Sequence, residues 1–262
     1  MFKKFAIVVI TTLALTVNVN AASDGELILK KNNPSEVEDC FEGLNRASFA
    51  LNQGLDKVIF KPIASVYRKF PSPIRTGFSN SLSNLSNLVT IPNNLLQGDF
   101  SLMSLNAGRF LINSTVGILG FIDVADYLGF SKYEKEDYGQ SLAKAGVGPG
   151  CYIVLPVLGP STARDTVASV ANFMGGDAWY NVTIRNDTHY FRDFDYYSSK
   201  VVGGVDFRAK NYDSLENLKE NSLDFYASVK SLYLQDRQQK ILNIKNLVET
   251  QNDSDWEEIE NQ

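Results

Sequence analysis

Residues 76–122 read "TGFSNSLSNLSNLVTIPNNLLQGDFSLMSLNAGRFLINSTVGILGFI", and Asp99 and Arg109 are the only charged residues in this stretch. Charged residues make up 21% of the chain, so a representative window of this length would hold about ten of them. The chain otherwise has the composition of a globular protein, with 44% hydrophobic and 11% aromatic residues. The exclusion of charge from one long segment is therefore the feature on which the fold prediction depends.

Two helices are predicted around this segment. Ser72 and Pro73 form a favourable helix start, because proline is tolerated in the first turn of a helix. Apolar residues then recur at helical spacing on one face: Ile74, Phe78, Leu82, Leu85 and Val89. Asp99 predicts the N-cap of the second helix, which runs toward Ser114 and is apolar on most sides.

The opposite face of the first helix is polar but carries no charge. It consists of hydroxyl and amide side chains: Ser79, Asn80, Ser83, Asn84 and Asn87. An ordinary surface helix has Lys, Glu and Arg on this face instead. Two interpretations remain open, namely a helix buried in a crowded soluble core and a helix that lies at membrane depth.

The membrane interpretation has a simple physical basis. A charged side chain at the bilayer centre costs about 2.5–3.5 kcal/mol, which explains why charge would be excluded. Serine and asparagine can instead bond to one another, or to water inside a lumen. The segment has too many polar residues to span a bilayer alone, so it would have to lie within one leaflet.

The remaining segments also favour helices. Asp39 to Glu42 resembles a capping box that would begin a helix at Asp39. Residues 151–156 (CYIVLP) predict a short strand, and residues 164–174 predict a helix. Apolar residues between Leu215 and Leu232 predict one long amphipathic helix from about Ser214 to Leu247. The sequence thus predicts a mainly α protein with short extended or hairpin segments.

The two ends of the chain are predicted to lie outside the folded domain. Residues 1–21 have the basic start, apolar stretch and small-residue cleavage site of a signal peptide, so we expect export. A polar lead-in (22–38), a helical domain (39–248) and an acidic tail (249–262) follow. No cysteine precedes Cys40, so no lipidation site is expected. Without leader and tail the body is close to neutral, which gives no electrostatic case for nucleic acid.

Catalysis finds little support in the sequence. The chain has one histidine, His189, and no CxxC or HExxH arrangement, so neither a metal site nor a cofactor is expected. Ser141 lies in a segment one residue short of a G-x-S-x-G nucleophile elbow, and charged residues precede it where a buried strand should stand. We predict that the protein is not an enzyme. A periplasmic lipid esterase that uses Ser141 and His189, and a soluble periplasmic lipid carrier, are the alternatives.

Several segments together resemble the MlaA (VacJ) family of outer-membrane lipid-asymmetry proteins. They are EDCFEGLNR (38–46), KPIASVYRKFPSPIRTGFSNSLSNL (61–85, with Lys61 in place of an arginine), IPNNLLQGD, GRFLINSTVGILGFIDVA, YGQSLAKAGVGPG, YIVLPVLGPSTARD and DFYASVKSLYLQDR (224–237). The specificity lies in the number and order of these matches, which run roughly from Asp39 to Arg237.

The resemblance implies a single ring-like helical domain that lies in the inner leaflet of the outer membrane, on the periplasmic side. Such proteins surround an amphipathic channel through which phospholipid misplaced in the outer leaflet moves inward. The implied partners are phospholipid, a porin trimer and the periplasmic lipid carrier MlaC. The implied lipid-channel residues in this chain are Asn80, Ser83, Asn84, Asn87 and Asn113. The stretch from Ser114 to Asp126 becomes a candidate gate through its glycines, Gly117 and Gly120.

Two departures from the family pattern stand out. The lipid anchor typical of the family is not found, and both cysteines stand where the family usually has proline. We predict a disulfide between Cys40 and Cys151, because export leads to an oxidising compartment and two cysteines allow only one pairing within a chain. A cross-link would also offset the loss of two rigid prolines. The alternative is a pair of unrelated buried thiols.

Overall fold

The computed structural model describes residues 37–132, 134–172, 177, 180–181 and 192–242. The predicted signal peptide, most of the lead-in and the acidic tail therefore lie outside the described residues. The described elements are α3 (Glu42–Leu55), the π-helix η2 (Asp56–Phe60), α4 (Lys61–Tyr67), α5 (Ser72–Leu96), α6 (Phe100–Thr115), α7 (Val124–Tyr127), α8 (Tyr138–Lys144), β1 (Tyr152–Leu155), β2 (Gly159–Thr162), α9 (Ala163–Ala171), α11 (Asp193–Lys210), α12 (Tyr212–Asn221) and α13 (Phe225–Leu242).

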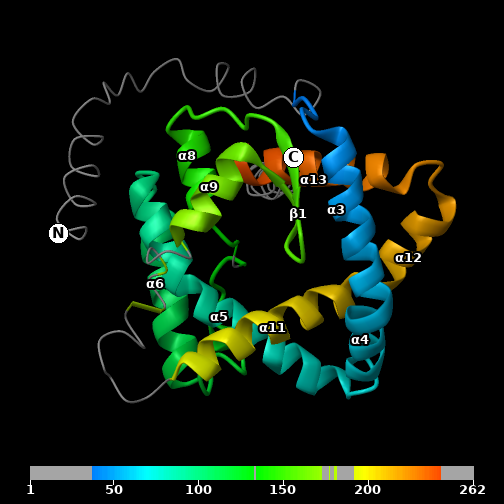
Figure 1. The fold of residues 1–262 in the computed structure, drawn as a ribbon. Helices are drawn as coiled ribbons and strands as arrows, with labels where there is room; N and C mark the ends of the chain where they lie inside the picture. The colour runs from blue at the N-terminus through cyan, green and yellow to red at the C-terminus, as the bar shows by residue number, and fades with distance from the viewer. Residues whose placement is uncertain (1–36, 133, 173–176, 178–179, 182–191, 243–262) are drawn as a thin grey trace, which may run out of the picture.

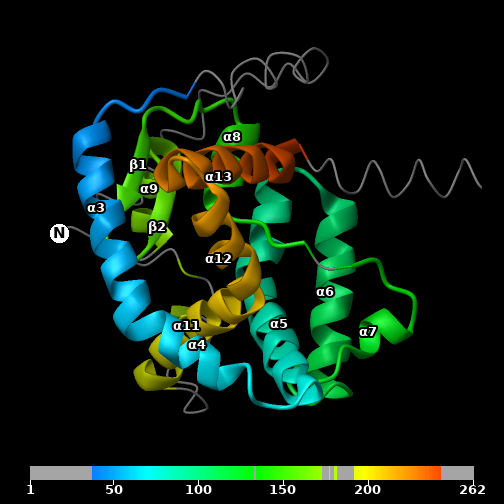
Figure 2. The same ribbon diagram turned by 90° about the vertical axis from the view of Figure 1, so that its right-hand side faces the viewer.

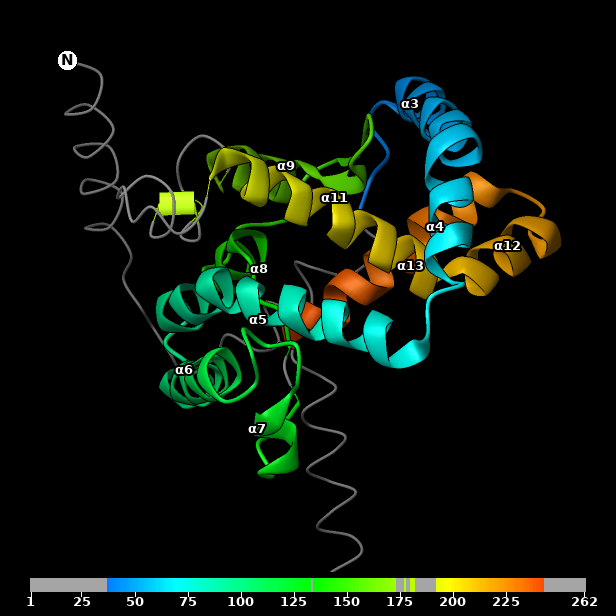
Figure 3. The same cartoon turned by 90° about the horizontal axis from the view of Figure 1, so that it is seen from below.

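The helices are arranged as a ring. In Figure 1, α3, α4, α5, α6 and α8 follow one another around a central opening, and the chain then returns to the start of α3 through β1. Figures 2 and 3 show α13 and α11 crossing the ring, with α5 and α6 on one side of the molecule and α9 and α11 on the other. The prediction of a mainly α, ring-like domain is confirmed. None of the described helices combines the length and apolar content needed to cross a membrane.

Several predicted helix boundaries are confirmed. Helix α5 begins at Ser72 with a proline in its first turn, and α6 follows the N-cap Asp99, whose carboxylate accepts a hydrogen bond from the Leu102 amide at 2.9 Å. The predicted strand is β1, which pairs antiparallel with β2 so that Tyr152 faces Thr162. Local signals in the sequence therefore set these starts.

The predicted start of the first helix is wrong. Helix α3 begins at Glu42, and its N-cap position is Phe41, which makes no side-chain cap. The Asp39 carboxylate is instead used in tertiary contacts, because it accepts hydrogen bonds from the Asn45 amide at 2.7 Å and from the Tyr226 hydroxyl. The Asp39 carboxylate could have capped the helix, but it is occupied by hydrogen bonds from Asn45 and from Tyr226 of α13.

The single long helix predicted near the end of the chain is also wrong. The structure has two helices, α12 and α13, separated at Ser222 to Asp224. Ser222 is extended (φ −90°, ψ 137°), and the Asp224 carboxylate then accepts a hydrogen bond from the Ala227 amide at 3.2 Å. Local side-chain bonding of this kind interrupts a helix that the apolar period alone would continue. Figure 2 shows the resulting change of direction between α12 and α13.

Helix α11 was not predicted from the sequence. It contains the segment Val201–Val205, with two adjacent glycines that are poor helix formers. Its start is fixed by the Arg192 amide, which donates to the Asp195 carboxylate at 2.8 Å. This helix supplies one wall of the ring interior.

The distribution of apolar side chains is unusual for a small domain. The main buried apolar cluster consists of Val37, Tyr152, Val154, Tyr226 and Leu234. Many larger apolar side chains are exposed, as at Leu44 (68%), Leu51 (53%) and Val58 (73%). These three recur every seven residues along α3 and η2 and so share one helix face, and an exposed apolar face marks a contact with protein or lipid.

Candidate functional site

A cavity of about 700 Å³ lies within the ring. Residues from α5, β2, α9, α11 and α13 and the segment around the start of α8 line it. Its wall combines apolar, hydroxyl and charged side chains, which is the composition that an amphipathic molecule requires. The volume falls within the range of about 300–1,000 Å³ typical of ligand pockets.

The α5 wall alternates apolar and hydroxyl side chains. Its cavity-lining residues are Ser79, Leu82, Ser83, Leu85, Ser86 and Val89. Positions three and four apart lie on one face of a helix, so this face mixes both kinds of side chain along its length. Ser79 also accepts a hydrogen bond from the Lys210 ammonium of α11, which joins the two walls.

The α11 wall is open at its centre. Gly203 and Gly204 line the cavity, and a Cβ atom added at either position would meet no atom within 4 Å. The free space beside these glycines is therefore part of the cavity. Lys200 and Lys210 flank them on the same helix, where Lys210 pairs with Asp206 at 3.1 Å.

A buried ion-pair network joins α8, α9 and α13 at the cavity wall. The Arg237 guanidinium donates to both carboxylate oxygens of Asp137 at 2.7 Å and to both of Asp165 at 2.9 Å. Burial by itself raises the pKa of each aspartate, but the hydrogen bonds and charge of Arg237 outweigh burial and hold both values below the usual range. Gly139 is required here, because a Cβ atom would come within 2.4 Å of the network.

The structure places the predicted channel residues in two different environments. Ser83 lines the cavity, as the sequence suggested. Asn84 is 4% exposed and donates to the Ser114 hydroxyl at 2.8 Å, so it lies between α5 and α6. Asn87 is 2% exposed, and its carbonyl oxygen has no hydrogen-bond partner. Neither amide is among the residues that line the cavity.

The other two predicted channel amides also lie away from the cavity wall. Asn80 is half-buried, and its amide is 3.5 Å from the Phe121 carbonyl. Asn113 donates to Asp123 at 2.8 Å and accepts from the Ala125 amide at 2.9 Å, so it fixes the turn that leads into α7. Of the three amides on the polar face of α5, Asn84 bonds to α6 and Asn80 lies near the turn that follows it, so this face contributes mainly its serines to the cavity.

The two charges of the opening segment have structural partners. Asp99 caps α6, and Arg109 is 2% exposed with its guanidinium 2.6 Å from Asp123. Arg109 also donates to the carbonyls of Phe130 and Ser131 at 3.1 and 2.8 Å. Asp99 therefore fixes the start of α6, and Arg109 holds the segment that follows the helix.

The two candidate gate glycines lie in a tight turn after α6. Gly120 has φ +86°, and a Cβ atom there would come within 2.4 Å of Asn84. A Cβ atom at Gly117 would come within 2.2 Å of the Ile122 carbonyl. The neighbouring residues Ile118 and Leu119 are exposed. Glycine is therefore needed for close packing of this turn on α5, and a gating role stays a prediction.

The residues of the esterase alternative are not assembled into a site that the structure describes. The Ser141 hydroxyl donates to the Asn93 carbonyl oxygen at 2.7 Å and accepts from the Gln97 amide at 3.1 Å. Its role in these contacts is to hold α8 against α5. His189 lies outside the described residues. Within the described ranges, no group of His, Cys, Asp and Glu side chains is arranged to hold a metal ion.

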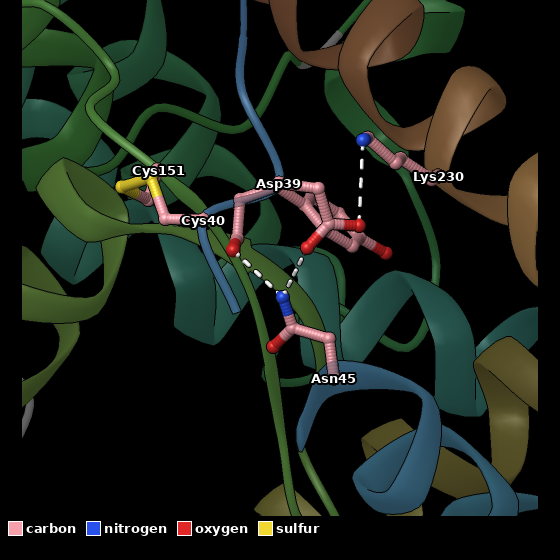
Figure 4. The surroundings of a disulfide bond; sticks show 6 residues. Asp39, Cys40, Asn45, Cys151 and Lys230 are labelled. Carbon is pink, nitrogen blue, oxygen red and sulfur yellow. Dashed lines mark hydrogen bonds and ion pairs between the residues drawn. A yellow bond between two sulfur atoms is a disulfide. The ribbon is translucent and has the colours of Figure 1, made fainter. Parts of the chain in front are cut away.

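The cysteines that the sequence analysis paired form a disulfide, with 5.6 Å between their Cα atoms. Figure 4 shows the bond beside a second polar cluster, in which Asp39 accepts from Asn45 at 2.7 Å and lies 3.4 Å from the Lys230 ammonium. Burial acts to raise the pKa of Asp39, but hydrogen bonds from Tyr226 and Asn45, with the charge of Lys230, together lower it. This cluster and the disulfide join the start of α3 to β1 and α13.

Sequence reasoning missed several cavity-lining groups. Ser79 was noted on the polar face, but Ser86, Lys135 and Lys200 were not singled out. The sequence signal that could have identified Ser86 was the spacing of serines three or four residues from leucines along α5. Nothing in the sequence indicates that Lys135 and Lys200, which are far apart in the chain, share one cavity.

Together, the apolar exterior and the amphipathic interior define a class of ring-shaped helical protein suited to amphipathic molecules. Comparison with known proteins is more specific. The family model described as MlaA lipoprotein matches residues 37–240, so the chain belongs to the MlaA family.

Individual relatives agree with this assignment. The chain is 31% identical over 228 residues to the "Intermembrane phospholipid transport system lipoprotein MlaA" of Escherichia coli (strain K12), covering 85% of this chain and 84% of the relative. It is 33% identical over 213 residues to an uncharacterized protein of Rickettsia bellii, covering 80% of each chain.

A solved structure described as "Structural basis for maintenance of bacterial outer membrane lipid asymmetry" is also similar. It superposes with a TM-score of 0.66 at 32% identity, covering 78% of this chain and 99% of that chain. These names link the family to phospholipid transport and to outer-membrane lipid asymmetry.

Proposed function

We propose that the cavity is part of an amphipathic channel through which mislocalised phospholipid is removed from the outer leaflet of the outer membrane, and that this removal maintains lipid asymmetry. The observation that carries the proposal is the contrast between the two surfaces of the ring. Large apolar side chains such as Leu44 and Val58 are exposed away from the cavity, while hydroxyl and charged groups accompany apolar ones in the cavity wall.

This arrangement fits the physical requirements of the task. The outer apolar surface would contact acyl chains. Contact with acyl chains is favourable for exposed apolar side chains such as Leu44 and Val58 and costly for charged ones. A polar headgroup crossing the hydrocarbon region needs hydrogen-bonding groups along its path. The serines of α5 supply such groups without adding charge, and the leucines between them contact acyl chains.

The proposal includes the setting of the protein. We propose that the mature chain, exported by its signal peptide, acts beside a porin trimer and passes phospholipid to the periplasmic carrier MlaC. Burial of the apolar exterior would hold it in the leaflet. Release of the mature protein from membranes by carbonate, without detergent, would contradict this mode of attachment.

The decisive experiment fills the cavity without disturbing the helices. Gly204→Phe would place a ring in the open space beside α11, since an added Cβ meets nothing there. Gly54→Phe is the matched control, because Gly54 lies on α3 with equal room and is not among the cavity-lining residues. Both variants are expressed in a Gram-negative strain that lacks its own family member.

The readout is the amount of phospholipid in the outer leaflet of the outer membrane. We expect the wild type and Gly54→Phe to lower it and Gly204→Phe to leave it high at equal protein abundance. A Gly204→Phe protein that is folded and fully active would exclude the cavity as the lipid path.

A further inference from the structure

The turn between β1 and β2 has a backbone conformation that its residues do not favour. Val157 at its centre has φ +67°, and a β-branched side chain in this region crowds the backbone. The Leu158 amide donates to the Pro156 carbonyl across it at 2.8 Å. This is a γ-turn of the rare form with positive φ, which is strained.

Asn52 of α3 holds the turn in place. Its side-chain amide donates to the Leu155 carbonyl at 2.9 Å, and its carbonyl oxygen accepts from the Val157 amide at 2.7 Å. A strained conformation persists only where its neighbours fix it. Glycine or asparagine at position 157 would adopt the same backbone at a lower cost. Local conformation therefore does not explain the valine.

Burial does not explain the apolar side chains of the turn either. Val157 is 61% exposed and Leu158 is 76% exposed, and neither belongs to the main buried apolar cluster. Strain and exposed apolar surface thus coincide at one turn, where each lowers the stability of the isolated protein. Strain of this kind is typical of sites that contact another molecule.

The turn continues the wall of the cavity. Pro160 and Ser161, which follow it on β2, are cavity-lining residues. With a rise of 3.3–3.4 Å per residue, Leu158 is about 7 Å along the chain from this wall. Figure 1 shows the β1–β2 hairpin over the central opening of the ring. Residues 151–163 contain no charged residue, so the surface that extends from the cavity here suits a hydrocarbon chain.

We propose that Val157 and Leu158 contact an acyl chain of a phospholipid at the edge of the cavity. This inference rests on the proposed function, because it requires lipid to occupy the cavity. The turn would cover apolar surface of a chain that extends out of the cavity, and removal of that surface from water is favourable. Asn52 would act as a positioning residue, because it fixes the turn and does not itself contact the lipid.

The first test measures lipid affinity. Dioleoyl phosphatidylglycerol is titrated into the purified full chain in detergent, with the wild type, L158N and L223N compared. L223N is the matched control, because Leu223 is also an exposed leucine outside the helices and does not line the cavity. We expect L158N to weaken binding by about tenfold and L223N to bind like the wild type.

A second test locates the acyl chain directly. Phosphatidylglycerol with a diazirine at the end of one acyl chain is bound to the wild type and irradiated, and the labelled peptides are identified by mass spectrometry. We expect label on residues 156–159. Label confined to other segments, or unchanged lipid affinity in L158N, would overturn the inference.

V157G separates contact from folding. It removes the strain together with the side chain, so the urea midpoint should stay the same or rise while lipid affinity falls. A lower midpoint would show that Val157 serves the fold, and the strain would then need no external contact.

Two further outcomes distinguish the inference from its alternatives. If L158N binds lipid normally but fails to maintain lipid asymmetry in cells, the turn contacts a protein and the acyl-chain assignment is wrong. If the wild type binds no phospholipid, the proposed function itself fails.

Discussion

The contact between α5 and α6 and the contact among α8, α9 and α13 both bury polar side chains, but of different kinds. The hydrogen bonds across the α5–α6 contact join neutral amides and hydroxyls, as from Asn106 to Asn94 and from Asn84 to Ser114. The buried Arg109 of α6 is instead paired with Asp123, at the turn before α7. Among α8, α9 and α13 the central group is an arginine bound to two aspartates.

The difference follows from the cost of removing each kind of group from water. A neutral amide pair is inexpensive to bury once it is hydrogen bonded, whereas each buried ion costs several kcal/mol before its partner offsets this. Neutral pairs therefore suit a region surrounded by acyl chains, and ion pairs suit a region in contact with water.

Acidification is expected to have the largest effect, because it removes the charge of carboxylates that are paired in the fold. The folded-state pKa values of Asp39, Asp137 and Asp165 lie below the ordinary 3.8. Their stabilisation is therefore complete above pH 3.8 and is lost as pH falls through the lower folded values. Glu136 acts in the opposite sense, because burial raises its pKa. The urea midpoint should be lower at pH 3 than at pH 6, and equal midpoints would contradict the assignment.

Replacement of Arg237 should be the most damaging single substitution. Arg237→Met leaves Asp137 without its counter-charge and Asp165 with Arg164 alone, and breaking a buried pair costs about 3–5 kcal/mol. The measurement is the free energy of unfolding by urea, followed by circular dichroism. Lys240→Met is the control, since its pair with Asp236 is exposed on the same helix and contributes below about 1 kcal/mol. A similar loss of unfolding free energy in both variants would show that the Arg237 network stabilises the fold no more than an exposed ion pair does.

Loss of the disulfide should have the next largest effect. The double variant Cys40→Ser, Cys151→Ser removes the cross-link between positions that are 111 residues apart. Loss of a disulfide of this kind lowers the free energy of unfolding by about 2–4 kcal/mol. Thiol titration of the exported, unreduced protein should find no free thiol. Two free thiols would show that the bond does not form in the cell, and the double variant would then lose no stability.

Substitutions in the neutral contact should have the smallest effects, and these should depend on the partner. Asn113→Leu leaves Asp123 and the Ala125 amide without their partner, so it should cost about 1–3 kcal/mol. Asn87→Leu is the comparison, because the Asn87 carbonyl oxygen has no partner to lose, and it should change stability by less than about 1 kcal/mol. A larger loss for Asn87→Leu would indicate an unseen partner, such as water or lipid.

Local signals in the sequence were sufficient for much of the fold. The starts of α5 and α6 depend on Ser72 and Asp99, and each acts within one helical turn. The break between α12 and α13 was missed because the apolar period continues across it, while the extended backbone of Ser222 ends α12. The period of a helix reports which residues share a face, and it does not report what each face contacts.

The site was less predictable for the same reason. Asn84, Asn87 and Ser83 share an uncharged polar face, but Asn84 bonds to α6, Asn87 is buried away from the cavity wall, and Ser83 lines the cavity. The pairing of Arg237 with Asp137 joins residues 100 positions apart in the sequence. No pattern in one sequence identifies such a partner. The family resemblance supplied the function that periodicity alone did not.

The disulfide has a topological consequence. Because Cys40 is bonded to Cys151, the intervening chain is a covalent macrocycle that includes α3, α4, α5, α6 and α8. These are the elements that follow one another around the opening in Figure 1. The start of α3 therefore cannot separate from the start of β1 while the disulfide is intact. Any molecule that reaches the inside of this macrocycle has to pass through one of its two open faces, since the perimeter is a continuous chain of covalent bonds.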